Sequence, residues 1–145
     1  MRICFDMDGT IADLYGVDGW LENLIAEDVR PYREAKVLLN MQALAKVLNN
    51  LQKKGYEIGI ISWLSKNGSK NYNEKVRLTK IEWLKKHLKS VKFDFLEIVN
   101  YGTDKNLVCT GNSDILFDDE IRNRESWKGI SYNVENIIEV LRGLK

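Results

Sequence analysis

Two acids stand one residue apart in the stretch ICFDMDGTIAD, residues 3–13, where Asp6 and Asp8 follow an apolar run. Carboxylates this close repel each other, and they cost free energy unless a cation lies beside them or water solvates both. The stretch is therefore either a solvated loop or a site built around a metal ion. An aspartate that a cation keeps ionised can act as a nucleophile toward phosphorus.

A second acidic pair, Asp118 and Asp119, directly follows the apolar segment DILF at 114–117. Four carboxylates gathered in one place would form a hard oxygen site. Such a site suits Mg²⁺, which binds a few carboxylates and keeps room for waters and substrate phosphate. We therefore predict a Mg²⁺ site to which Asp6, Asp8, Asp118 and Asp119 contribute, with a small phosphorylated substrate beside it.

Phosphate chemistry needs further groups, and the sequence offers a candidate for each. Ser62 ends the apolar run YEIGIIS and could donate its hydroxyl to a phosphate oxygen. Gly9 would let the backbone turn sharply and bring an N–H to the phosphate. A lysine is needed to balance charge in the transition state. Lys105, in YGTDKNLV, is the best-placed candidate, and Lys92 is its competitor.

The elements that must position these residues alternate between strand and helix. The apolar runs predict strands over 2–5, 56–61, 95–101, 114–117 and 129–133, and the intervening patterns predict helices over 18–27, 32–54, 73–90 and 134–144. Alternation of this kind predicts an α/β fold with a five-stranded, mostly parallel sheet covered on both faces. The carboxyl ends of parallel strands share one edge, where ligands bind, so Asp6, Ser62 and Asp118 should meet there.

Length and composition limit the function classes. The 145 residues suit one domain spanning 1–145, and 22 basic against 21 acidic residues argue against a nucleic-acid partner. No apolar run approaches the length of a membrane span. The start, MRICFDMD, reaches acids too soon for a secretory signal, so we expect a cytoplasmic protein. Nothing in the sequence indicates its oligomeric state.

Four segments, taken in order, resemble the motifs of the haloacid dehalogenase (HAD) superfamily of phosphatases. They are DMDGT after the first strand, the strand that ends at Ser62, Lys105 ahead of a later strand, and DILFDD. The stretches PYREAKVLLNMQALAKVLNNLQKKGYEIGIIS and YNEKVRLTKIEWLKKHL further resemble the 5′(3′)-deoxyribonucleotidase family. The resemblance implies a three-layer, Rossmann-like core and hydrolysis of a phosphate monoester.

The resemblance also implies a role for each matching residue. Asp6 would attack phosphorus and form an aspartyl-phosphate, while Asp8 would protonate the leaving oxygen and then activate water. Mg²⁺ would be held by the Asp6 carboxylate, the Asp8 carbonyl, and either Asp118, which we favour, or Asp119. The phosphate would be held by Ser62, Lys105, and the backbone N–H groups of Met7 to Gly9 and of Trp63, with Thr10 positioning the loop or Asp8.

The chain departs from these nucleotidases between the first two motifs, where they insert a helical cap. Only residues 14–40 are available for a cap, enough for one short helix and a loop. Candidates for stacking on a base are Tyr15, Trp20, Tyr32 and Trp63. We expect a nucleotide-like substrate. The alternatives are a sugar phosphate or a nucleic-acid 3′-end, and, in another class, a phospho-receiver or a non-catalytic phosphate-binding domain.

Overall fold

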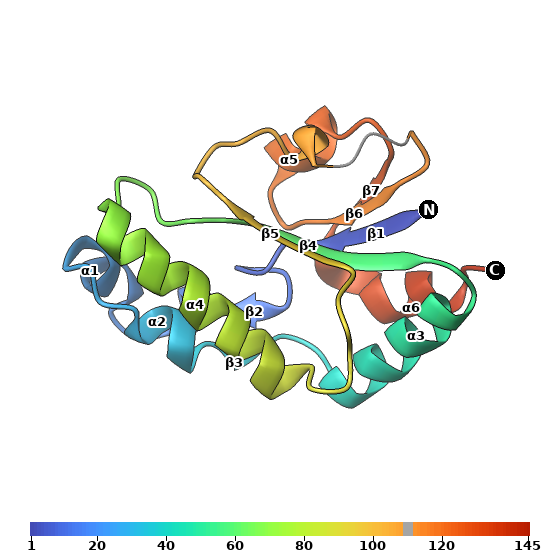
Figure 1. Ribbon diagram of the computed structural model, residues 1–145, viewed down its shortest axis with the longest axis horizontal. Coiled ribbons are helices and arrows are strands. Elements are labelled where there is room, and N and C mark those ends of the chain that lie inside the picture. Colours follow the sequence, from blue (N-terminus) through green and yellow to red (C-terminus); the bar gives the residue numbers. More distant parts are fainter. Residues whose placement is uncertain (109–111) are drawn as a thin grey trace.

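A five-stranded sheet forms the centre of the computed structural model, which describes residues 1–108 and 112–145 (Figure 1). Its strands are β1 (Arg2–Phe5), β4 (Glu57–Trp63), β5 (Phe95–Val99), β6 (Ile115–Phe117) and β7 (Ile130–Tyr132), in the spatial order β5-β4-β1-β6-β7. All neighbouring pairs are parallel. The predicted α/β fold with a five-stranded parallel sheet is therefore confirmed.

Helices cover both faces of the sheet, although unequally. Three helices, α3 (Met41–Lys53), α4 (Lys70–His87) and α6 (Ile137–Arg142), lie on one face, and the short α5 (Ile121–Ser126) lies on the other (Figure 1). The larger core cluster joins Ile3 and Phe5 of β1 to Leu48 of α3 and Leu84 of α4. On the opposite face Trp127 packs on Ile61 and Leu116. Because strand side chains alternate between faces, β1 supplies residues to both clusters.

The single helix predicted over 32–54 is wrong. The chain forms α2 (Arg30–Glu34), the short strand β3 (Lys36–Val37) and then α3. Asn40 starts α3, because its side chain accepts a hydrogen bond from the Ala43 N–H. The indole of Trp83 donates to the Ala35 carbonyl at 2.8 Å, and β3 pairs antiparallel with β2 (Ala12–Asp13). These tertiary contacts keep the linking residues extended in spite of their helical pattern.

The boundaries of other helices also differ from the prediction. The helix predicted from residue 73 begins earlier, because Ser69 is its N-cap and accepts from the Tyr72 N–H. Asn73 accepts instead from the Ser65 N–H. The closing helix is shorter than the predicted 134–144: a 3-10 turn, Val134–Asn136, precedes α6.

Residues 14–40 lie beside the N-terminal half of α4 (Figure 1). They contain a 3-10 turn (Leu14–Gly16), α1 (Trp20–Ile25), α2 and β3. The Tyr72 hydroxyl donates to the Asp28 carbonyl at 2.9 Å, and the Ser69 hydroxyl donates to Glu27 at 2.8 Å. Tyr32 packs in a small core cluster with Tyr72 and Val76 of α4. The segment is thus anchored to the helix that follows the second apolar strand.

Within the described parts of the chain, no helix combines the length and the apolar character needed to cross a membrane.

Candidate active site

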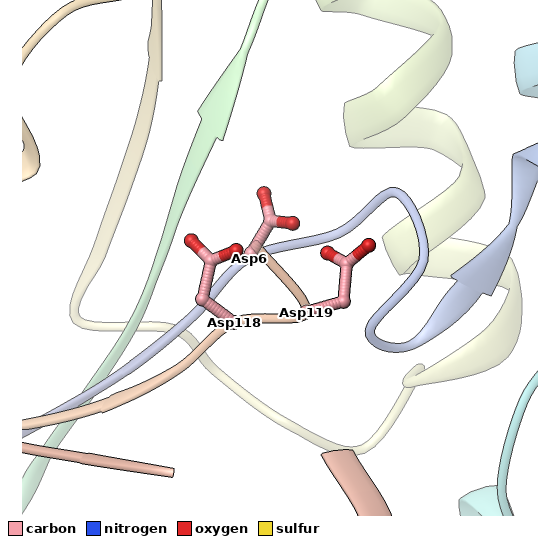
Figure 2. A group of neighbouring side chains, drawn as sticks. All are labelled: Asp6, Asp118 and Asp119. Atoms are coloured by element: carbon pink, nitrogen blue, oxygen red, sulfur yellow. The ribbon is translucent and has the colours of Figure 1, made fainter. Parts of the chain in front are cut away.

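Strand register places two acids side by side at the carboxyl edge of the sheet. Phe5 of β1 pairs with Phe117 of β6, so Asp6 and Asp118 are the first residues beyond two neighbouring strands. The Asp6 N–H continues the pairing by donating to the Phe117 carbonyl at 2.9 Å. Oxygens of Asp6, Asp118 and Asp119 all lie within 4.8 Å of one another. Figure 2 shows the three carboxylates turned toward the same space.

Mutual repulsion and burial make this cluster a poor place for three negative charges without a cation. Burial, then the charge of Asp6 and the neighbouring Asp118, raise the pKa of Asp119 to about 7. Burial and Asp6 also raise the pKa of Asp118, against the opposing effect of Lys105. A divalent cation would offset both effects, and three carboxylates with room for further oxygen ligands match the preference of Mg²⁺. The donor set therefore fits the predicted metal.

Lys105 reaches this cluster from a 3-10 turn, Lys105–Leu107, between β5 and β6. Its ammonium donates to Asp6 at 3.0 Å and to Asp118 at 2.6 Å, and the residue is only 3% exposed. Burial alone would lower the pKa of Lys105, but the charges of Asp6 and Asp118 outweigh burial and raise it. Lys105 is therefore a permanent cation beside Asp6. The competitor Lys92 is exposed, and its carbonyl accepts from Gln52.

Asp8 is held apart from the other acids by a second buried lysine, Lys80. The Lys80 ammonium donates to Asp8 at 2.9 Å, to the Ser62 hydroxyl at 2.7 Å and to the Trp63 carbonyl at 2.7 Å. Lys80 is 1% exposed and Ser62 is fully buried. The Asp8 carboxylate is thus an ion-pair partner of Lys80, and only its carbonyl remains as the predicted metal ligand.

Our reading of the sequence missed Lys80, although α4 carries a signal for it. Val76, Lys80 and Trp83 are spaced so that they share one face of a helix, and both Val76 and Trp83 are buried. A lysine in an apolar stripe is almost never fully buried without a partner of opposite charge. That position alone predicts an acidic partner for Lys80, but it does not say which acid.

The loop from Met7 to Ala12 holds the acids in place. Gly9 has a φ of +81°, and a Cβ there would lie 2.3 Å from an oxygen of Asp119, so both conformation and space require glycine. The Gly9 N–H donates to the Ala12 carbonyl at 2.8 Å. The Gly9 N–H, predicted to contact the phosphate, closes the loop in this structure.

Met7 and Thr10 secure the same loop from within. The Met7 side chain is buried in the main core, and its carbonyl accepts from the N–H groups of Thr10, Ile11 and Ala12. The Thr10 hydroxyl accepts from the Asp119 N–H at 3.2 Å and lies 3.3 Å and 3.4 Å from carboxylate oxygens of Asp119 and Asp6. Thr10 therefore ties the loop to Asp119 rather than positioning Asp8.

A cavity of about 630 Å³ opens next to Asp6, Asp8, Asp119 and Lys105. Its lining comes from residues 14–40, from Trp63 and the segment after β4, and from the segments after β1, β5 and β6. All four aromatic residues predicted to stack on a base line this cavity: Tyr15, Trp20, Tyr32 and Trp63. Trp63 is fixed there, because its indole donates to the Thr103 carbonyl at 2.9 Å.

The chain was compared with protein families, curated proteins and solved structures. No family model and no curated protein matches it. Among solved structures, D,D-heptose 1,7-bisphosphate phosphatase from Burkholderia thailandensis is 12% identical, with a TM-score of 0.54 over 88% of this chain and 74% of that chain. A chain in the structure of the Pnkp1/Rnl/Hen1 complex is 21% identical, with a TM-score of 0.56 over 92% of this chain.

The second match extends over only 44% of the neighbour, so this chain spans less than half of that protein. At these identities the likeness is one of fold. The chain therefore shares the Rossmann-like α/β fold of these two structures, one of which is a sugar-bisphosphate phosphatase.

Proposed function

We propose that the protein is a Mg²⁺-dependent phosphate monoester hydrolase of the HAD type, which works through an aspartyl-phosphate on Asp6. The observation that carries the proposal is the convergence of Asp6, Asp118 and Asp119 within 4.8 Å, beside a cavity that Asp6 and Asp119 line, with buried Lys105 bonded to Asp6 and Asp118. A surface cluster of acids would have neither the buried cation nor the adjoining cavity. The phosphatase neighbour supports the same reading through its fold.

Carboxylate oxygens of Asp6, Asp118 and Asp119, with the Asp8 carbonyl, would hold Mg²⁺, which when bound would neutralise the acids and polarise phosphate oxygens. The Lys105 ammonium lies 3.0 Å from an oxygen of Asp6 and offsets part of the negative charge there. An Asp6 oxygen then forms a bond to phosphorus as the bond to the leaving oxygen breaks. Hydrolysis of this acyl phosphate by water restores the Asp6 carboxylate and releases inorganic phosphate.

Asp8 would move the protons in both steps. It gives a proton to the leaving oxygen and later takes one from the attacking water. The Lys80 ammonium donates to the Asp8 carboxylate at 2.9 Å and so positions it for both steps. Lys80 also donates to the Ser62 oxygen at 2.7 Å, so the Ser62 O–H would be left to donate to a phosphate oxygen.

A nucleotide-like substrate accounts best for the cavity. Tyr15, Trp20, Tyr32 and Trp63 offer aromatic rings near the acids, and nucleobases stack on such rings. We propose that residues 14–40 act as a small cap, because they supply much of the lining of the cavity beside the acids. A sugar phosphate is the second candidate, favoured by the neighbour that acts on a heptose bisphosphate. Such a substrate would leave the aromatic walls without a planar partner.

The test is phosphate release from nucleoside monophosphates, sugar phosphates and p-nitrophenyl phosphate, with Mg²⁺ or with a chelator. We expect turnover that requires the metal and is highest with nucleotides.

Asp6→Asn should lower kcat by more than about a thousandfold while the fold is retained, because the nucleophile is gone. The exposed Asp18→Asn serves as a matched control. After acid quench, wild type should carry a phosphoryl group that hydroxylamine removes. Failure of wild type to hydrolyse any of these esters, or full activity of Asp6→Asn, would overturn the proposal.

A further inference from the structure

Aromatic rings and cations contact one another in and beside the cavity. Trp63, Lys66 and Tyr101 line the cavity, and Arg122, which is not among the lining residues, packs on the Trp63 ring; we call these four residues the aromatic-basic wall. The rings of Trp63 and Tyr101 pack with centroids 4.9 Å apart at 58°. The Arg122 guanidinium lies 5.2 Å from the centre of the Trp63 ring, and the Lys66 ammonium lies 5.7 Å from that of Tyr101. Both distances fall within the range of cation–π contacts, so the rings hold the two cations in place.

These two cations differ from the two buried lysines in one respect. Lys80 and Lys105 are each bonded to carboxylates, whereas within the described residues Lys66 and Arg122 form no ion pair. Both side chains belong to exposed residues. A cation–π contact positions a positive charge without neutralising it. The wall therefore presents two fixed, exposed cations that can still bind an anion.

A series of contacts joins the wall to the catalytic cluster. Lys105 bonds to Asp6 and lies 5.4 Å from the Trp63 ring centre, Trp63 packs on Tyr101, and Tyr101 contacts Lys66. The cavity holds about 630 Å³, which leaves space beyond one phosphate group. A phosphate bound at Asp6 would therefore direct its leaving group along rings and cations.

Acids near the cavity do not cancel this charge. Glu27 lines the cavity but accepts hydrogen bonds from the N–H and the hydroxyl of Ser69, at 2.7 Å and 2.8 Å. Glu120 also lines it, yet it lies outside ion-pair distance of Arg122 and Lys66 among the described residues. Uncommitted cations beside aromatic rings are the combination that binds a nucleotide chain through both its phosphates and its bases.

We propose that the aromatic-basic wall is a subsite for a second phosphate group carried by the leaving group. The preferred substrate is then a nucleotide with two phosphates: the one that is removed at Asp6, and another that contacts Arg122 and Lys66. Two sources share this chemistry, a nucleoside bisphosphate and the phosphorylated end of an oligonucleotide. This inference rests on the proposed function, because it assigns the substrate of the same site.

The experiment compares kcat/KM for three substrates with the same base: a nucleoside 3′-monophosphate, the nucleoside 3′,5′-bisphosphate and a dinucleotide with a 3′-phosphate. Wild type should prefer at least one of the two longer substrates over the monophosphate by about tenfold or more, since each charge-assisted contact contributes about that factor. The preference should shrink as salt increases, because the cations are exposed. The longer substrate that wild type prefers identifies the source of the second phosphate: a nucleoside bisphosphate or the end of an oligonucleotide.

Arg122→Gln and Lys66→Gln should each lower the ratio of kcat/KM for the preferred substrate to that for the monophosphate, by about tenfold for a full contact. The matched controls are Arg142→Gln and Lys89→Gln, which replace exposed cations outside the cavity and should leave the ratio unchanged. An equal kcat/KM for all three substrates in wild type would overturn the inference. A parallel loss on every substrate in Arg122→Gln would overturn it as well.

The two proposals fail in different ways. If p-nitrophenyl phosphate and the monophosphate are hydrolysed but the second phosphate brings no preference, the subsite is wrong and the proposed function stands. If none of these esters is hydrolysed with Mg²⁺ present, the proposed function is wrong, and the subsite is rejected with it.

Discussion

Replacing Lys80 with methionine would remove the cation that links Asp8, the Ser62 hydroxyl and the Trp63 carbonyl. Methionine has a similar length and fits an apolar stripe, so loss of packing contributes little. A buried polar group that loses its partner costs about 1–3 kcal/mol, and here Ser62 is fully buried. The Asp8 side chain is 18% exposed, so water can take over part of its solvation. Methionine also avoids the cost of burying an ammonium group.

Together these terms predict a loss of about 2–4 kcal/mol in the free energy of unfolding. In a chain of this size that loss lowers Tm by roughly 10 °C. Urea denaturation of the metal-free protein would measure it. The exposed Lys85→Met on the same helix is the control and should change stability by less than about 0.5 kcal/mol.

The activity of Lys80→Met tests whether the Lys80 contacts position Asp8. If Lys80 positions Asp8, kcat should fall by about a hundredfold for an alkyl phosphate, whose leaving oxygen needs a proton. It should fall less for p-nitrophenyl phosphate, whose leaving group departs as an anion. A variant that unfolds like Lys85→Met and keeps its rate on both esters would show that the Lys80 contacts matter neither to the fold nor to Asp8.

Three other substitutions test the loop and the acids. Gly9→Ala should lower stability and activity more than Gly102→Ala. Both glycines have a positive φ, but only at Gly9 would a Cβ meet Asp119, at 2.3 Å. Equal Tm values for the two variants would contradict this prediction. Without metal, Asp119→Asn should be more stable than wild type at pH 8, and the difference should shrink as the pH falls through about 7, where folded wild type takes up a proton. Urea denaturation midpoints of both proteins would be measured from pH 8 to below pH 7. A constant difference between the two midpoints would show that the pKa of Asp119 is not raised. Asp118→Asn should raise the Mg²⁺ concentration needed for half-maximal phosphate release, and an unchanged requirement would exclude Asp118 as a ligand.

The acidic cluster could be predicted from the sequence because its placement follows from general rules for parallel sheets. Apolar runs end at Phe5 and Phe117, and acids follow both. Once the strands are parallel, their carboxyl ends share an edge whatever the details of packing, so Asp6 and Asp118 meet. The partners of Thr10 and Gly9 were less predictable, because they depend on how the loop closes. The Gly9 N–H closes the loop with Ala12, and Thr10 bonds to Asp119.

The break in the predicted helix over 32–54 was decided by tertiary contacts. Residues 35–40 fit a helical pattern, but Trp83 takes the Ala35 carbonyl and β2 pairs with β3. Intrinsic helix preferences amount to less than about 1 kcal/mol for most residues, so a few such contacts override them. The boundaries of α4 and α6 were also mispredicted, because weak helix preferences do not fix where a helix begins or ends.

By itself, the sequence determined that this protein places acids from two distant segments at one edge of a parallel sheet, because strand direction and right-handed connections leave them no other place. Among the 22 lysines and arginines the sequence singled out Lys105, but only the tertiary structure decided that Lys80 also faces an acid and which acid each lysine meets. Lys80 meets Asp8 because α4 packs with that face against the sheet, and Lys105 meets Asp6 because a turn buries it. Such pairings depend on how a helix is rotated against its neighbours and on how a loop closes, and neither is encoded in local spacing.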